Sequence, residues 1–278
     1  MISWWQSIVL GIVEGITEFL PISSTGHLTV VEKMMGLPID DPSVTAYTAI
    51  IQVGAMVASI IYFWGDIVRF ATAWFKGLRN AAERGSDYRM GWAIIAGFIP
   101  TATIALLAEP LITGPLRSLW AVVVGLIGWS FVMWLGDRFG KQNRGEETIT
   151  VRDGLILGTL QSLALVPGVS RSGATMAGGL LLGLDRVAAT RMSFFLGIPT
   201  LIASGLYQAV KEAKHIADGV GWASTAIGTV VSGVVAYASI AWLLRYVSKH
   251  NFTVFIIYRV ALGLIIAALL VTGVVSAT

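Results

Sequence analysis

Six long apolar stretches constrain this chain more than any other feature of its sequence. Each is long enough to cross the hydrocarbon core of a bilayer as a helix, and they cover roughly 44–64, 90–108, 118–136, 192–210, 222–244 and 253–275. Only 13% of all residues are charged, against about a quarter in a typical soluble domain. A surface so poor in polar groups needs lipid around it, so the sequence predicts an all-α integral membrane protein with about six transmembrane helices.

Two further apolar segments contain residues that a plain spanning helix avoids. The first, 5–22, holds two glutamates and stops at Pro21, and the second, 153–184, is broken at Pro167. Non-helical backbone is tolerated at membrane depth only where protein or a wet cavity surrounds it. We therefore predict that both segments are re-entrant helix–loop–helix hairpins.

The basic residues of the polar gaps predict a topology. The positive-inside rule places three gaps rich in Arg and Lys in the cytoplasm: 65–89, 137–152 and 245–252. The gaps 28–43 and 109–117 then lie outside. With this alternation, the first hairpin (1–27) enters the membrane from outside and the second from the cytoplasm.

The two hairpins also resemble each other. A shift of 147 residues, which sets Gln161 opposite Glu14, makes six pairs identical over residues 10–37, Ser23 with Ser170 among them. Similarity with opposite orientation predicts an inverted-topology repeat, in which the broken elements meet near the midplane and build the site. We expect a single membrane domain, 1–278. Its repeats, about 1–136 and 153–278, are joined by a cytoplasmic loop, 137–152.

The first hairpin carries two acidic side chains at helical spacing. Glu14 and Glu18 lie four residues apart, so one helix face presents both. Carboxylates at membrane depth must face a cavity or a partner. As hard oxygen ligands they suit a divalent metal ion, and a structural pair neutralised by Arg171 or by backbone N–H groups is the alternative.

A run of small hydroxyl residues, Ser23, Ser24 and Thr25, follows the break in the first hairpin, and Gly26 and His27 come next. Hydroxyls and free backbone N–H groups at a helix start form an anion site that phosphate commonly occupies. Ordinary N-capping explains one of the hydroxyls but not three. The histidine is the only one at predicted membrane depth, and it suits a general acid, base or nucleophile, or a structural hydrogen-bonded role.

Arg171 is the only arginine or lysine within either hairpin. Its guanidinium can grip a phosphate at two points, and Ser170, Ser172 and Thr175 surround it with hydroxyls. Alternatively, Arg171 neutralises the glutamates, and the two roles are compatible. Arg259, near the start of the last span, is expected to extend toward the membrane interface.

Together the two motifs resemble the undecaprenyl-diphosphatase family associated with bacitracin resistance. The run from Glu14 to His27 matches its glutamate-rich motif with the Ser-Ser-Thr-Gly-His ending. The run from Pro167 to Thr175 matches its Pro-Gly-x-Ser-Arg-Ser-x-x-Thr motif. Further similarity around Gln52 and Pro199 extends the resemblance over essentially the whole chain.

The resemblance implies a multi-pass enzyme of the bacterial cytoplasmic (inner) membrane. It would hydrolyse undecaprenyl diphosphate to undecaprenyl phosphate and so recycle the carrier lipid for peptidoglycan and other cell-wall polymers. The active site would face the extracytoplasmic side, and activity would need a divalent cation, Mg or Ca. The implied partners are a polyprenyl diphosphate and bilayer lipids. The net charge of +3 gives no case for nucleic acid, and the oligomeric state, a homodimer included, stays open.

The resemblance also assigns roles by position. Glu14 and Glu18 are implied as catalytic or metal-linked carboxylates, and Arg171 as the diphosphate clamp. Ser24, His27 or an activated water is the nucleophile. The implied substrate-binding residues are Ser23, Thr25, Gly26, Ser170, Ser172 and Thr175.

Two alternatives compete with this enzyme. A polyprenyl-phosphate flippase or anion transporter can also use an inverted repeat with broken helices, but a carrier of anions has little need of two adjacent glutamates. The acid-phosphatase-like lipid phosphatases carry similar short elements, but here no histidine follows Arg171 until His215.

Overall fold

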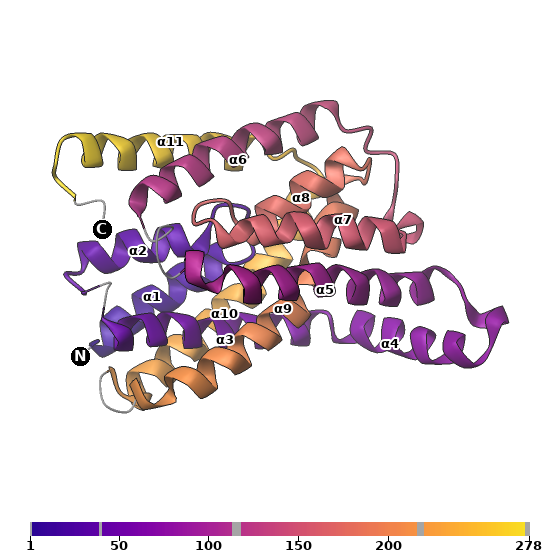
Figure 1. Cartoon of the computed structure of the whole chain (residues 1–278), viewed down its shortest axis with the longest axis horizontal. Helices are drawn as coiled ribbons and strands as arrows, with labels where there is room; N and C mark the ends of the chain where they lie inside the picture. Colours follow the sequence, from indigo (N-terminus) through magenta and orange to yellow (C-terminus); the bar gives the residue numbers. More distant parts are fainter. Residues whose placement is uncertain (1, 39–40, 113–117, 216–219, 276–278) are drawn as a thin grey trace. The chain divides into compact units, whose positions relative to one another are not determined.

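The computed structural model describes the chain except for residues 1, 39–40, 113–117, 216–219 and 276–278. In this described part the protein is all-helical, with eleven α-helices joined by short turns and 3-10 segments (Figure 1). The α-helices are α1 Trp4–Thr17, α2 Ser24–Met34, α3 Pro42–Tyr62, α4 Trp64–Arg79, α5 Ser86–Ile112, α6 Leu119–Phe139, α7 Val151–Gln161, α8 Arg171–Leu181, α9 Arg186–His215, α10 Trp222–Val247 and α11 Thr253–Val271.

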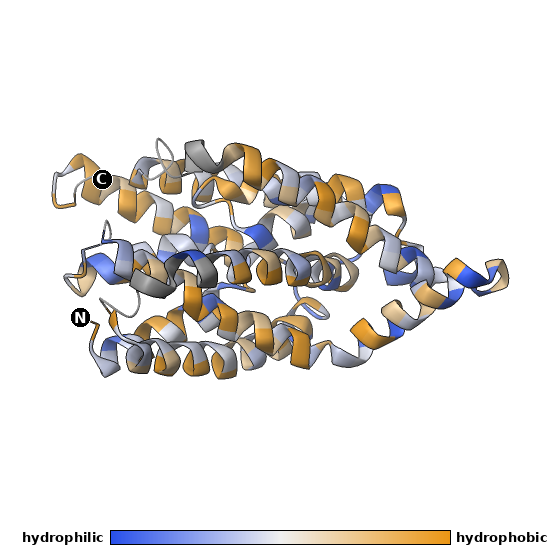
Figure 2. Cartoon of the chain, turned by 60° about the horizontal axis from the view of Figure 1, so that its bottom comes forward, coloured by the Kyte–Doolittle hydropathy of each residue, from blue (hydrophilic) through white to orange (hydrophobic). Residues whose placement is uncertain are grey.

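Six of the described helices are long and apolar enough to cross a membrane, namely α3, α5, α6, α9, α10 and α11. They coincide with the six predicted spans, with ends displaced by a few residues, so this prediction is confirmed. Figure 2 shows apolar residues predominating along the long helices. The protein is therefore a multi-pass membrane protein.

The chain divides into two compact units, and each draws on both halves of the sequence. The first unit comprises Met1–Leu20, Ser24–Phe63 and Ile198–Leu243, and the second comprises Pro21–Ser23, Trp64–Gly197 and Leu244–Thr278. The division into repeats, the inverted topology and the re-entrant character of the hairpins stay predictions.

In the first unit, glycines let α1 and α3 pack closely on α10. A Cβ added to Gly15 of α1 would stand 2.6 Å from the carbonyl oxygen of Ser232, and one added to Gly54 of α3 would overlap the carbonyl of Thr229. Small residues at such crossings are typical of helices packed in membranes. This packing fixes the rotation of α1, and therefore the direction in which Glu14 and Glu18 point.

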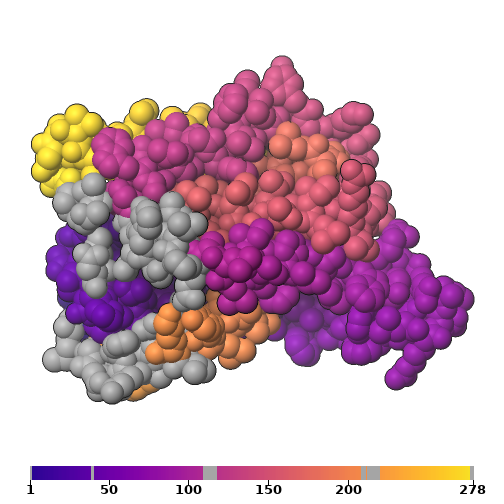
Figure 3. Space-filling model, in the orientation of Figure 1, coloured from indigo at the N-terminus to yellow at the C-terminus, as the bar shows by residue number. Residues whose placement is uncertain are grey.

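In the second unit, α7 lies against α5 and α11 lies beside α6 (Figures 1 and 3). Close approach of α5 and α7 depends on Gly97 and Gly158, where an added Cβ would overlap the facing backbone. The Thr101 hydroxyl of α5 donates to the Gly158 carbonyl at 2.8 Å. These contacts hold α7, the first half of the second hairpin, in place.

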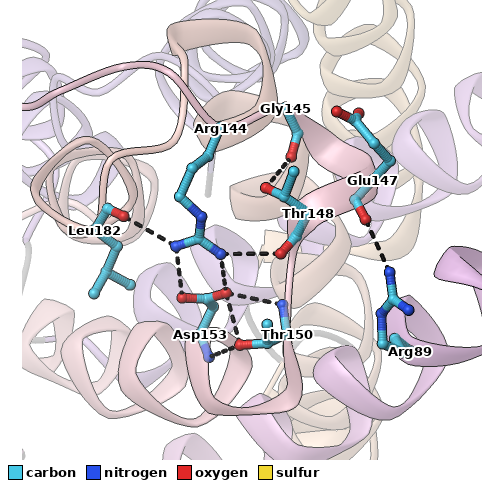
Figure 4. Close-up of polar contacts among 8 residues, drawn as sticks. All are labelled: Arg89, Arg144, Gly145, Glu147, Thr148, Thr150, Asp153 and Leu182. Atoms are coloured by element: carbon cyan, nitrogen blue, oxygen red, sulfur yellow. Dashed lines mark hydrogen bonds and ion pairs between the residues drawn. The ribbon is translucent and has the colours of Figure 1, made fainter.

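Arg144 fastens the predicted cytoplasmic loop 137–152 (Figure 4). Its guanidinium pairs with both oxygens of Asp153, at 3.1 and 2.6 Å, and donates to the carbonyls of Thr148 and Leu182. Burial raises the pKa of Asp153, but hydrogen bonds from Arg144 and Thr150 outweigh it and hold that pKa below its usual value. Arg144 thus ties the loop to the end of α8.

The polar gaps contain more helix than the sequence indicated. Helix α2 continues to Met34, inside the gap 28–43, because Leu28 and Glu32 are buried on one of its faces. The 16-residue helix α4 fills much of the gap 65–89. Most of the gap 109–117 lies outside the described residues.

Candidate active site

The second helices of the two hairpins correspond position by position. Under the shift of 147 residues, α2 and α8 begin and end at equivalent positions. The residue before each is a serine with a positive φ, 76° at Ser23 and 74° at Ser170. A positive φ also follows each helix, at Gly36 and Gly183. The similarity of the two hairpins therefore extends from sequence to backbone conformation.

A positive φ is unusual for serine and costs on the order of 1–3 kcal/mol. At Ser170 two hydrogen bonds offset this cost: its Oγ accepts from the Gly173 N–H at 3.2 Å and its carbonyl accepts from the Ala174 N–H at 2.8 Å. The hydroxyls of Ser170 and Ser172 lie 3.1 Å apart. Two hydroxyls and the first-turn N–H groups thus gather at the start of α8, where an anion is favoured.

The break in the first hairpin brings Glu18 and Ser24 together. The Ser24 hydroxyl donates to the Glu18 carboxylate (Oε2) at 2.7 Å. Glu18 is 8% exposed and Ser24 is half-buried. A carboxylate in this position can receive the hydroxyl proton when the oxygen attacks an electrophile. The sequence indicated both residues but not the contact between them.

The other predicted residues of this hairpin lie on α1 and in the first turn of α2. Glu14 lies on α1, one turn before its C-cap Glu18, and is completely buried. In the first turn of α2, Thr25 is exposed, Gly26 is buried and His27 is half-buried. The start of α2 therefore exposes the Thr25 side chain and part of the His27 side chain, while the Glu14 side chain is buried.

Glu14 and Glu18 could hold a divalent cation that also binds phosphate. Among the residues that the structure describes, no three His, Asp or Glu side chains gather closely enough to hold one ion. Glu14 and Glu18 would therefore supply two ligands, and phosphate oxygens and water the rest. Mg²⁺ is commonly held in this way, by one or two carboxylates together with substrate phosphates.

Arg171 is the first residue of α8, and its guanidinium lies against α9 at Gly197. A Cβ added to Gly197 would stand 1.5 Å from Arg171 Nη1 and 2.7 Å from Cζ. Thr175, one turn further along α8, is fully buried, and its hydroxyl contacts Ser193 Oγ of α9 at 2.6 Å. Helix α9 thus contacts α8 through the hydrogen bond of Thr175 with Ser193 and leaves at Gly197 the space that the arginine occupies.

The expectation for Arg259 was wrong. Its side chain is 0% exposed and donates to backbone carbonyls and a serine hydroxyl inside the protein. The guanidinium satisfies backbone carbonyls inside the protein, and for this reason the Arg259 side chain does not extend to the membrane interface. The sequence contained a signal for this buried position, because a basic residue inside a membrane span usually faces the protein interior and has a function.

These features define a class: a polytopic helical membrane protein whose broken helices present carboxylates, hydroxyls and an arginine suited to a phosphate group. A family model described as "Bacitracin resistance protein BacA" matches residues 7–265, and the chain belongs to that family.

Curated relatives match the chain over nearly its whole length. It is 54% identical over 274 residues to undecaprenyl-diphosphatase 3 of Frankia casuarinae, covering 98% of this chain and 99% of the relative. It is 52% identical over 283 residues to undecaprenyl-diphosphatase of Cutibacterium acnes, covering 99% and 100%. It is 53% identical over 273 residues to undecaprenyl-diphosphatase 1 of Streptomyces avermitilis, covering 98% of each chain.

Proposed function

We propose that this protein hydrolyses undecaprenyl diphosphate to undecaprenyl phosphate and inorganic phosphate. Relatives named undecaprenyl-diphosphatase are more than 50% identical to it over almost the full chain. The structural observation that carries the proposal is the hydrogen bond from Ser24 to Glu18. A carrier that only binds phosphate does not need a carboxylate that can take the proton of a serine hydroxyl. In the cell, the reaction would return the carrier lipid to peptidoglycan and other cell-wall synthesis.

The contact favours Ser24 as the nucleophile among the candidates. Its Oγ would attack the terminal phosphorus while Glu18 accepts the proton, and the P–O bond to the bridging oxygen would break. Undecaprenyl phosphate would leave with a proton from His27. Water would then attack the phosphoserine and give a proton to His27, while Glu18 returns its proton to the Ser24 oxygen as phosphate leaves.

Charge stabilisation is the remaining requirement, since a diphosphate is strongly anionic. Arg171 is proposed to bind the phosphate oxygens at two points. Ser23, Thr25, Gly26, Ser170, Ser172 and Thr175 belong to the two helix starts proposed to cradle the diphosphate. A divalent cation held by Glu14 and Glu18 would neutralise further charge on those oxygens.

The proposed location is the bacterial cytoplasmic membrane, with the active site facing the extracytoplasmic side. The distribution of basic residues over the polar gaps supports this orientation. The substrate's prenyl chain would stay in the bilayer while its diphosphate reaches the two helix starts.

Phosphate release from undecaprenyl diphosphate by purified protein in detergent tests the proposal. The comparison variants are Ser24→Ala, His27→Ala and Arg171→Ala, with Thr29→Ala as a matched control, since its hydroxyl donates within α2, to the Thr25 carbonyl. Release by wild type and Thr29→Ala that collapses in the other variants supports an enzyme, and phosphoserine at residue 24 in quenched samples supports the nucleophile. Bound lipid without release would favour a carrier instead.

A further inference from the structure

Arg259 is a completely buried arginine in the predicted membrane span of α11. Every acceptor that it has in the described part of the chain is a backbone carbonyl or a serine hydroxyl. Nε donates to Ser130 Oγ at 3.1 Å, and Nη1 donates to the Pro21 carbonyl at 3.0 Å. Nη2 faces the carbonyls of Gly168 at 2.9 Å, Val169 at 3.1 Å, Gly125 at 3.2 Å and Leu126 at 3.4 Å.

Three of these carbonyls belong to the two helix breaks. Pro21 lies two residues before Ser23, and Gly168 and Val169 directly precede Ser170. Carbonyls in non-helical backbone have no partner within a helix, and at membrane depth an unsatisfied one costs several kcal/mol. Arg259 supplies donors to both breaks at once, and the residues 21–23, 168–170 and α11 belong to one compact unit.

The guanidinium also lies close to the start of α8. Nη1 is 3.5 Å from the position that a Cβ on Gly173 would take, and the N–H of Gly173 is capped by Ser170. Helix α6 packs directly on the second break, where a Cβ on Gly125 would overlap the Pro167 carbonyl. The arginine is thus enclosed between α6, the two breaks and the first turn of α8.

We propose that Arg259 is a positioning residue that holds the two serine turns, at Ser23 and Ser170, in a fixed relation. It acts through the carbonyls before each turn, and so maintains the backbone from which Ser24 and Arg171 project. This role rests on the proposed function only where it concerns catalysis. Lysine cannot replace the arginine, because a single ammonium cannot span acceptors that lie around a planar guanidinium.

Two readouts test the role: hydrogen–deuterium exchange of backbone amides, and steady-state phosphate release. The variants are Arg259→Lys and Arg259→Met, compared with wild type after size-exclusion chromatography in detergent. Arg144→Lys is the matched control, because Arg144 also binds carbonyls but at the loop 137–152 (Figure 4).

In Arg259→Lys we expect exchange in residues 21–26 and 168–175 to speed up about tenfold, as for loss of a hydrogen bond to a charged group. We expect kcat to fall about 100-fold, as for a reacting group displaced by about 1 Å, with KM changed less than about threefold. Arg144→Lys should speed exchange only around residues 144–153 and keep the wild-type kcat per folded molecule.

Unchanged exchange in both segments of Arg259→Lys would overturn the proposal, and so would a kcat loss no larger than in Arg144→Lys. If wild-type protein released no phosphate, the proposed function would fail, while the exchange experiment would still decide whether Arg259 orders the two turns.

Discussion

The contact between Arg171 and Gly197 makes a sharp prediction about activity. In Gly197→Ala the new Cβ would stand 1.5 Å from Arg171 Nη1, whereas ordinary contact begins at about 3.4 Å. The guanidinium must therefore move by about 2 Å. Since a displacement of 1 Å can cost about 10²-fold in rate, we expect kcat/KM to fall at least about 100-fold, or about 2.7 kcal/mol of transition-state stabilisation.

The same change should leave the fold intact. Gly197 lies inside α9, and alanine there gains about 0.5–1 kcal/mol of helix stability relative to glycine, which offsets the displaced side chain. Loss of activity with an unchanged or higher Tm is thus the expected signature, and it separates a site effect from unfolding.

The assay is phosphate release over a range of substrate concentrations, together with Tm in detergent. Gly128→Ala is the control, because a Cβ at Gly128 of α6 meets nothing within 4 Å, and it should keep wild-type kcat/KM. Wild-type kcat/KM in folded Gly197→Ala would refute the reasoning, since the enzyme would then tolerate a displaced Arg171.

Four further predictions follow from the site and the topology. Arg171→Lys should lose nearly as much turnover as Arg171→Ala, because a point charge cannot reproduce a two-point clamp; wild-type-like turnover in the lysine variant would remove that role. Exhaustive chelation should abolish phosphate release and added Mg or Ca should restore it, whereas full activity after chelation would rule out a metal at Glu14 and Glu18. Burial, opposed in part by a hydrogen bond from Thr48, raises the pKa of Glu32 to about 7 from 4.5, so the folded state keeps a proton that the unfolded state loses. Stability should then fall by roughly 3 kcal/mol as pH rises from 4.5 to 7, and Tm of Glu32→Gln should lack this slope; an unchanged slope would contradict the assignment. A cysteine introduced as Asp41→Cys should react with an impermeant thiol reagent from outside and Arg79→Cys should not, while the reverse pattern would invert the predicted topology.

The spans and the helix breaks could be predicted because both depend on short, continuous stretches of sequence. Length and hydropathy identify a spanning helix without knowledge of its neighbours, and Pro21 and Pro167 disrupt helices wherever these pack. Helix α4 was missed for the opposite reason: its basic residues were interpreted only as loop charge, although an amphipathic helix carries such charge on one face.

The contacts within the site could not be derived in the same way. The hydrogen bond between Glu18 and Ser24 depends on the turn between them, and that turn depends on the positive φ of Ser23, which no propensity favours. Arg259 and Pro21 are 238 residues apart, so no local pattern relates them. The sequence therefore indicated which side chains could react or bind a ligand, and the packing determined which of them are in contact.

At the two serines with positive φ, the residue that favours thermal stability differs from the residue that favours catalysis. Glycine would adopt a φ near 75° without strain, but it would remove a hydroxyl from each helix start. A population of variants selected for thermal survival alone should therefore accumulate glycine at positions 23 and 170 and lose turnover as it does so. Selection for growth that depends on cell-wall synthesis should retain serine at both positions. The residues found at positions 23 and 170 would therefore show which selection a library of variants had undergone.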